Sequence, residues 1–108
     1  MLHLLGRLAD SEAAYRNGLA VDHNNLGVLV DLCLVVAAQK RFDEALEIGD
    51  RVLARAPKSA LAHLRKGMIY EQAGRPAEAL RCVQTALKFD PNLADAQAAL
   101  ARLRAPAR

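Results

Sequence analysis

The sequence predicts an all-α protein built from antiparallel pairs of helices, and three observations support this prediction. The first is composition: 53% of the 108 residues are hydrophobic but only 4% are aromatic, and much of the apolar content is alanine, which favours packed helices over sheets. The second is a sequence repeat: Arg7, Arg41 and Arg75 are equally spaced, and their spacing is the period of the repeat. The third is the placement of glycine and proline, which punctuate the chain where helices should end or begin.

The repeat appears when the chain is shifted along itself by this period. Arg7 then coincides with Arg41 and Arg75, and Pro57 coincides with Pro91. The other coincident positions are Leu19, Leu53 and Leu87; Asp10, Glu44 and Glu78; Ala45 and Ala79; and Leu46 and Leu80. These coincidences fall where a helix pair needs them, so each unit is predicted to contain two helices.

Local signals set the expected bounds of the helices in the last complete unit. Ser59 is expected to cap a helix that runs to about Ala73, and Gly74 can close it in the left-handed conformation. Pro76 suits the first turn of the following helix. Pro91 cannot continue that helix, so the helix should end before it.

The same reasoning places the remaining helices. Asn92 is expected to cap a terminal helix, and the preceding unit should contain helices over Leu26–Gln39 and Phe42–Arg55. In the first unit we expect one full helix over Leu8–Val21, with its partner missing or reduced to Met1–Leu5.

Two segments carry a resemblance to a known family: "KGMIYEQAGRPAEALRCVQTALKFDPN" (Lys66–Asn92) and "QKRFDEALEIGDRVLARAP" (Gln39–Pro57). Both resemble the tetratricopeptide repeat (TPR) family. The matching positions in the first segment are Gly67, Tyr70, Gly74, Ala79, Leu80, Ala86, Leu87, Asp90 and Pro91. The chain departs from the pattern in having no Trp, and in carrying Cys33 where Gly67 stands one unit later.

The resemblance implies a single TPR-like α-solenoid domain over residues 1–108, which is a right-handed superhelical array of antiparallel helix pairs. It would comprise about two and a half repeats and a C-terminal capping helix. The expected units are a partial first repeat (1–25), a second repeat (26–59), a third repeat (60–92) and the capping helix (93–105).

Catalytic and cofactor chemistry finds no support in the sequence. The histidines His3, His23 and His63 are far apart, and no HxxxH, phosphate-loop, dinucleotide-binding or nucleophile-elbow motif occurs. We therefore expect no enzyme, no metal and no cofactor. Cys33 and Cys82 form no disulfide pattern, and the chain has no apolar run long enough to span a bilayer, so we expect a reduced, cytoplasmic protein without membrane insertion.

The charge distribution disfavours nucleic acid as a partner. Fifteen Lys and Arg residues against twelve Asp and Glu residues give a net charge of +3. The basic residues are scattered, apart from a C-terminal group of Arg102, Arg104 and Arg108. A nucleic-acid-binding surface usually gathers basic residues on one face, with aromatic residues nearby.

The stretch "LGVLVDLCLVVAA" (Leu26–Ala38) contains a single charged residue, Asp31, and is apolar on nearly every side. We expect four of its residues to face neighbouring helices: Leu29, Leu32, Cys33 and Val36. The family resemblance implies that the first helix of each unit lines a concave groove. The candidate groove residues are Val30, Asp31, Leu34, Ala38, Leu64, Arg65, Met68, Gln72, Ala98, Ala99 and Arg102.

An apolar strip formed by Val30, Leu34, Leu64 and Met68 predicts a protein-interaction module, or adaptor, that holds a hydrophobic or amphipathic peptide or helix. The alternative is that these residues are simply buried. An acidic peptide tail is disfavoured, because Asp31 would repel it. The sequence does not identify the partner or its pathway.

A second hypothesis is self-association into a homodimeric building block, or a role as a fragment of a larger TPR protein. The helix Leu8–Val21 lacks the partner helix of a full repeat, so Ala9, Ala13 and Tyr15 would be left uncovered.

Overall fold

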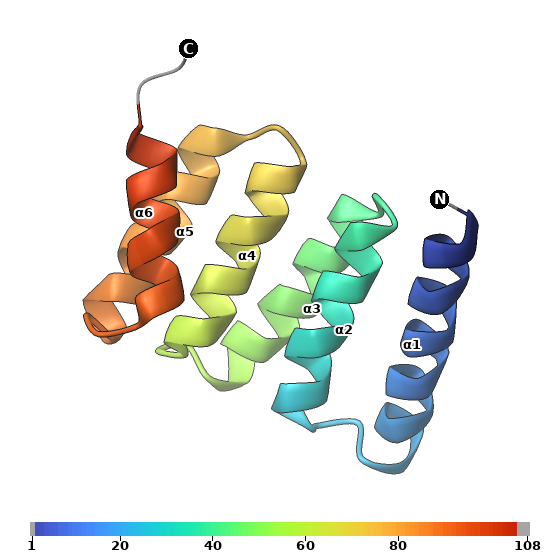
Figure 1. Ribbon diagram of the computed structural model, residues 1–108. Helices are drawn as coiled ribbons and strands as arrows, with labels where there is room; N and C mark the ends of the chain where they lie inside the picture. The colour runs from blue at the N-terminus through green and yellow to red at the C-terminus, as the bar shows by residue number, and fades with distance from the viewer. Residues whose placement is uncertain (1, 106–108) are drawn as a thin grey trace.

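The computed structural model describes residues 2–105 and shows six α-helices and no strand within them. The helices are α1 (Leu2–Val21), α2 (Leu26–Ala38), α3 (Phe42–Arg55), α4 (Ala60–Gln72), α5 (Pro76–Phe89) and α6 (Ala94–Arg104). In Figure 1 they lie side by side in an array, with the chain ends at its opposite sides. Helices α2, α4 and α6 form the front layer of this view, and α3 and α5 lie behind them. The all-α array of helix pairs expected from the sequence is confirmed.

Most helix bounds follow the local signals in the sequence. The Ser59 hydroxyl accepts a hydrogen bond from the Ala62 N–H at 3.2 Å and so caps α4. Gly74 adopts a φ of +77° just beyond the end of α4, and Pro76 is the first residue of α5. Helix α5 ends at Phe89, before Pro91. These four expectations are confirmed.

Of the two alternatives for the first repeat, a partner helix that is missing or one reduced to Met1–Leu5, the described residues show the first. Helix α1 is one continuous helix from Leu2 to Val21 and begins earlier than the expected Leu8. The expected cap of the terminal helix is wrong. Asn92 does not cap α6: the N-cap position belongs to Leu93, which makes no side-chain capping bond. The reason is that the Asn92 N–H donates to Asp90 Oδ1 at 3.1 Å, which holds Asn92 in a turn ahead of the helix.

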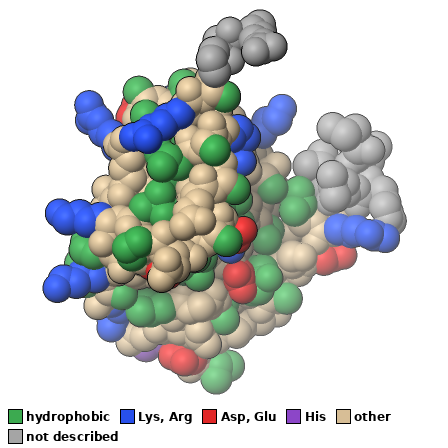
Figure 2. All heavy atoms as spheres, turned by 60° about the vertical axis from the view of Figure 1, so that its left-hand side comes forward, with side chains coloured by type: hydrophobic (Ala, Val, Ile, Leu, Met, Phe, Trp, Pro, Cys, Tyr) green, Lys and Arg blue, Asp and Glu red, His purple; other side chains and the backbone are tan. Residues whose placement is uncertain are grey.

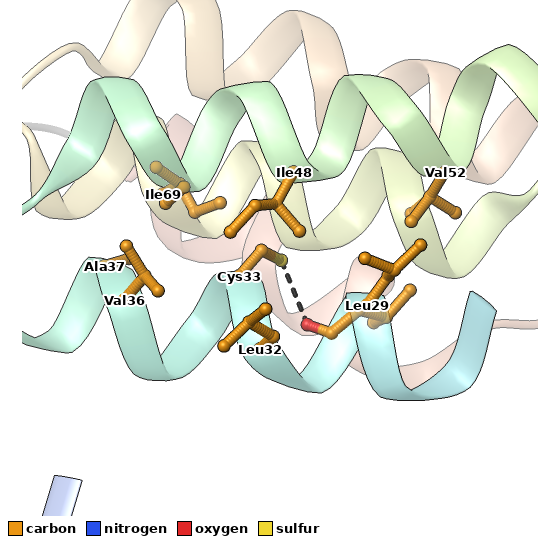
Figure 3. Packing of buried hydrophobic residues seen from close by; sticks show 11 residues of the cluster. Leu29, Leu32, Cys33, Val36, Ala37, Ile48, Val52 and Ile69 are labelled. Atoms are coloured by element: carbon orange, nitrogen blue, oxygen red, sulfur yellow. Dashed lines mark hydrogen bonds between the residues drawn. The ribbon is translucent and has the colours of Figure 1, made fainter. Parts of the chain in front are cut away.

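The apolar helix α2 is buried because it has neighbours on several sides. It packs against α1, α3 and α4. Leu29, Leu32, Cys33 and Val36 are each at most 1% exposed, which confirms that they face other helices. Figure 3 shows these side chains packed against Ile48 and Val52 of α3 and Ile69 of α4. An ordinary surface helix buries one face against its neighbours, whereas α2 buries several.

The thiol of Cys33 is part of this core. Its Sγ donates a hydrogen bond to the Val30 carbonyl oxygen at 3.0 Å, drawn as the dashed line in Figure 3. Burial raises the pKa of Cys33 to about 11. The thiol is therefore neutral and behaves as a small apolar side chain.

A second core cluster forms the C-terminal part of the array. It comprises Leu64, Val83, Ala86, Ala96 and Ala99, from α4, α5 and α6. Gly67 allows α4 and α5 to approach closely, because a Cβ atom there would lie 3.0 Å from Val83 Cγ2 and 3.2 Å from the Ala79 carbonyl oxygen. Helix α4 thus contributes residues to both clusters, with Ile69 in the first and Leu64 in the second.

Ion pairs join α1 to the following helix pair. Glu12 of α1 accepts hydrogen bonds from Arg41 at 2.7 Å, from Arg16 at 2.8 Å and from Gln39 at 2.9 Å. Arg16 also donates to Glu44 of α3 at 2.6 Å. Hydrogen bonds from Arg41 and then Gln39 lower the pKa of Glu12 to about 2, although burial opposes the shift.

Within the described residues, no helix combines the length and the apolar character needed to cross a membrane.

Lys40 offers a test of the turn between α2 and α3. It has a φ of +66° and occupies the position that Gly74 takes one repeat later. Lys40→Gly should raise the free energy of unfolding by about 0.5–1 kcal/mol, because relief of left-handed strain outweighs the entropy that glycine adds to the unfolded chain. Urea unfolding followed by circular dichroism measures the change. Gly74→Ala is the matched control and should lower stability; a Lys40→Gly variant less stable than the original chain would contradict this account.

The Glu12 ion pairs predict a dependence of stability on pH. A carboxylate with a lowered pKa stabilises the folded state above its unfolded pKa, and this contribution is lost as the pH falls through the folded pKa. The window for Glu12 runs from about 4.5 down to about 2. Glu12→Gln should cost about 1–2 kcal/mol at pH 7, less than full linkage predicts because solvent screens the arginines.

The measurement is urea unfolding of both proteins at pH 7 and pH 2.5. The gap between Glu12→Gln and the original chain should narrow at the lower pH. Glu47→Gln is the control, since Glu47 is exposed and forms no ion pair with the described residues. An equal gap at both pH values would show that the charge of Glu12 is not what stabilises the α1 contact.

Candidate protein-binding pocket

A pocket of about 320 Å³ lies between α4 and α6, and we call it the α4–α6 pocket. Its lining residues are Leu64, Arg65 and Met68 from α4, and Asp95, Ala98, Ala99 and Arg102 from α6. On both helices these residues are adjacent or lie three or four positions apart, which places each set on one helix face. Figure 2 brings the C-terminal side of the array forward and shows apolar side chains on its surface, with Lys and Arg side chains toward the edges.

The base of the α4–α6 pocket is apolar and firmly packed. Leu64 is 1% exposed and Ala99 is 3% exposed, and both belong to the second core cluster. Met68 packs against the same cluster and remains half-buried. Since a thioether side chain is flexible and polarisable, Met68 can adapt to guests of different shape.

Arg65 lines this pocket and carries an unsatisfied donor. Its Nη1 donates to Met68 Sδ at 3.2 Å, and a thioether sulfur is a weak acceptor. Its Nε is buried and is the one buried side-chain nitrogen or oxygen among the described residues without a hydrogen-bond partner. A buried donor left unpaired costs about 1–3 kcal/mol, so the Arg65 side chain would gain from turning Nε toward an acceptor in the pocket.

The opposite wall carries a fixed ion pair. Arg102 of α6 donates to both carboxylate oxygens of Glu71 on α4, at 2.8 and 2.7 Å. This hydrogen bonding lowers the pKa of Glu71 and raises that of Arg102. With Asp95 also in the lining, the positive charges of Arg65 and Arg102 are balanced locally. The pocket therefore lacks the excess positive charge that would attract an anion.

The α4–α6 pocket brings together six of the residues that the sequence placed in a groove: Leu64, Arg65, Met68, Ala98, Ala99 and Arg102. The other five lie outside its lining. Asp31, Ala38 and Gln72 are exposed, and Leu34 is half-buried against the first core cluster.

The sequence predicts a continuous exposed apolar strip, but two of its four residues, Val30 and Leu64, are buried. Val30 is 5% exposed and belongs to the first core cluster, because α4 packs against α2. Leu64 is equally inaccessible apart from its contribution to the base of the pocket. Both residues belong to the hydrophobic core, which is the alternative that the sequence left open.

Asp95 lines the pocket but was assigned by sequence reasoning to no site. It lies three residues before Ala98 and four before Ala99, so helical spacing alone puts it on the same face. Within residues 2–105, no three His, Cys, Asp or Glu side chains gather in a way that could hold a metal ion.

The repeated helix pairs and the pocket between α4 and α6 are typical of a helical-repeat protein that binds other proteins. Two family models described as tetratricopeptide repeat match the chain, one over residues 36–103 and the other over residues 4–60. Each match covers more than half of the chain, and the chain belongs to the tetratricopeptide repeat family. Such domains are generally non-catalytic protein-interaction modules. No curated protein matches the chain significantly in sequence.

Solved structures of similar fold include MamA and two TPR domains of RPAP3 proteins. MamA (residues 41 to the end) from Desulfovibrio magneticus RS-1 is 22% identical with a TM-score of 0.75, over 94% of this chain and 58% of that one. The first TPR of Spaghetti (RPAP3), bound to the HSP90 peptide SRMEEVD, is 19% identical with a TM-score of 0.77, over 91% and 78% of the two chains.

The second TPR domain of human RPAP3, in complex with the HSP70 peptide SGPTIEEVD, is 19% identical with a TM-score of 0.78, over 94% of this chain and 84% of that one. At these identities the likeness concerns the fold.

Leu64 provides a test of where the core ends and the pocket begins. Leu64→Ala should lower the free energy of unfolding by about 2–4 kcal/mol, because it removes buried methyl groups from a packed cluster. Leu61→Ala on the same helix is the matched control and should change stability by less than about 0.5 kcal/mol, since Leu61 is 41% exposed. Equal effects of the two substitutions in urea unfolding would refute the assignment of Leu64 to the core.

Proposed function

We propose that the chain is a protein-interaction module that holds an apolar or amphipathic segment of another protein in the α4–α6 pocket. The observation that carries this proposal is the combination of an apolar base with the unpaired Nε of Arg65. A guest with an apolar side chain would fit the base, and a carbonyl or carboxylate oxygen beside it could accept from Nε once the Arg65 side chain turns toward it.

The size of the pocket limits the kind of guest. A volume of about 320 Å³ lies at the low end of ligand pockets, which range over roughly 300–1,000 Å³. It suits one or two anchoring side chains rather than a whole ligand, as in peptides that dock through a few apolar anchors. The rest of the segment would then extend over the exposed residues Gln72, Asp31 and Ala38.

Charge separates this proposal from the peptides in the two RPAP3 complexes, which end in EEVD. Here Arg102 is already paired with Glu71, and Asp95 faces the same pocket. A run of carboxylates would find one free guanidinium, that of Arg65, and would meet the exposed carboxylate of Asp31. An apolar or amphipathic segment avoids this repulsion.

The test uses a displayed library of random peptides, selected on the immobilised chain and on two variants. Ala98→Lys places a long charged side chain in the pocket, whereas Ala101→Lys places the same side chain on an exposed position of α6 outside the lining. Peptides selected by the original chain should bind Ala101→Lys equally well and bind Ala98→Lys at least tenfold more weakly. Isothermal titration calorimetry with the selected peptides measures the affinities.

Two results would overturn the proposal: no enrichment of any peptide motif, or enriched peptides that bind Ala98→Lys as tightly as the original chain. Light scattering behind size-exclusion chromatography should precede the selection. A dimer that dissociates in Ala98→Lys but not in Ala101→Lys would assign the pocket to self-association, the second hypothesis from the sequence, instead of to a foreign segment.

A further inference from the structure

A second pocket, of about 300 Å³, lies at the end of the α2–α3 helix pair, beside the turn that connects α1 to α2. Its lining residues are His23 and Asn24 from the turn, Leu29 from α2, and Arg51, Ala54 and Arg55 from α3. We call it the arginine pocket. None of its residues lines the α4–α6 pocket, so it is independent of the function proposed above.

The lining of the arginine pocket is positively charged. Arg51 and Arg55 lie one helical turn apart on α3, and neither forms an ion pair with the described residues. His23 adds a ring nitrogen to the same wall, and no Asp or Glu lines the pocket. Like charges at this spacing repel each other. An anion placed between the two guanidinium groups would remove that repulsion.

At the corresponding place in the next repeat two side chains of the chain contact each other. A shift of one repeat replaces Leu29 by His63 and Arg55 by Phe89. There the two rings pack with centroids 5.5 Å apart, and His63 Nε2 lies 3.0 Å from the Pro57 carbonyl oxygen. The second repeat has an aliphatic side chain and an arginine at these two positions, and it leaves an opening.

We propose that the arginine pocket binds a small organic anion. A carboxylate or phosphate group would pair with Arg51 and Arg55, since guanidinium groups match the geometry of both through paired hydrogen bonds. The apolar body of the molecule would lie against Leu29 and Ala54. The Asn24 side chain can donate a further hydrogen bond or accept one.

The test is a titration of the ¹⁵N-labelled chain followed by NMR, first with inorganic phosphate and then with phenyl phosphate. Both should give saturable shifts confined to the amides of residues 23–29 and 51–55. Phenyl phosphate should bind at least fivefold more tightly than phosphate, because its ring adds contact with Leu29 and Ala54. The double substitution Arg51→Gln/Arg55→Gln should weaken binding of phenyl phosphate at least tenfold.

Two further variants keep the result interpretable. Arg81→Gln is the matched control: it removes an exposed arginine of α5 that forms no ion pair with the described residues, and it should leave the affinity unchanged. Ala54→Leu keeps both arginines but fills the pocket, and it should weaken binding of phenyl phosphate at least fivefold. Circular dichroism checks that each variant remains helical.

A capped tripeptide with a central phosphoserine distinguishes the two sources of such an anion. Tighter binding of phenyl phosphate assigns the pocket to a free small molecule, and tighter binding of the tripeptide assigns it to a side chain of another protein. Shifts that do not saturate, or that are equal in the Arg51→Gln/Arg55→Gln variant, would overturn the proposal. Equal affinities for phosphate and phenyl phosphate would overturn the role of the apolar wall.

Discussion

The structure depends on the covering of α2. A helix this apolar is stable in water only if its neighbours remove most of its circumference from solvent, and α1, α3 and α4 do so together. Other features follow from this requirement. Because α4 must lie against α2, Val30 becomes a core residue rather than a groove residue. The position of α4 in turn determines where α6 can pack through α5, and the gap that remains between α4 and α6 is the α4–α6 pocket.

Apolar burial and ion pairing have different roles at the junctions between repeats. Each junction carries at least one ion pair: Arg41 with Glu12, Lys66 with Asp50, and Arg102 with Glu71. Ion pairs near the surface contribute roughly 0–1 kcal/mol each, and even the Glu12 group with its several partners contributes less than the buried clusters. The two-pronged contact of Arg102 with Glu71 adds a directional contact at the last junction. Packing therefore supplies most of the stability of the array.

Features that depend on adjacent residues were predictable from the sequence, whereas features that depend on packing between distant segments were not. Helix ends set by adjacent residues, such as the Ser59 cap and the Gly74 turn, were predictable because the chemistry is local. Helical spacing also identified most of the α4–α6 pocket. It could not tell that Val30 would be covered, because exposure depends on how closely the first helix of the next repeat approaches. The arginine pocket was not predicted from the sequence for the same reason: His23, Leu29 and Arg55 come together only when three segments pack against one another.

The membership of α4 in both core clusters has a consequence for how the molecule opens. In a linear array each repeat is stabilised by its neighbours, and unfolding propagates along the chain from its ends. Unfolding of the N-terminal half would expose the side of α4 that carries Ile69, and unfolding of the C-terminal half would expose the side that carries Leu64. The two halves are thus thermodynamically coupled through one helix. A segment held between α4 and α6 would restrain that coupling helix, and so slow hydrogen exchange in α2, which the segment need not touch.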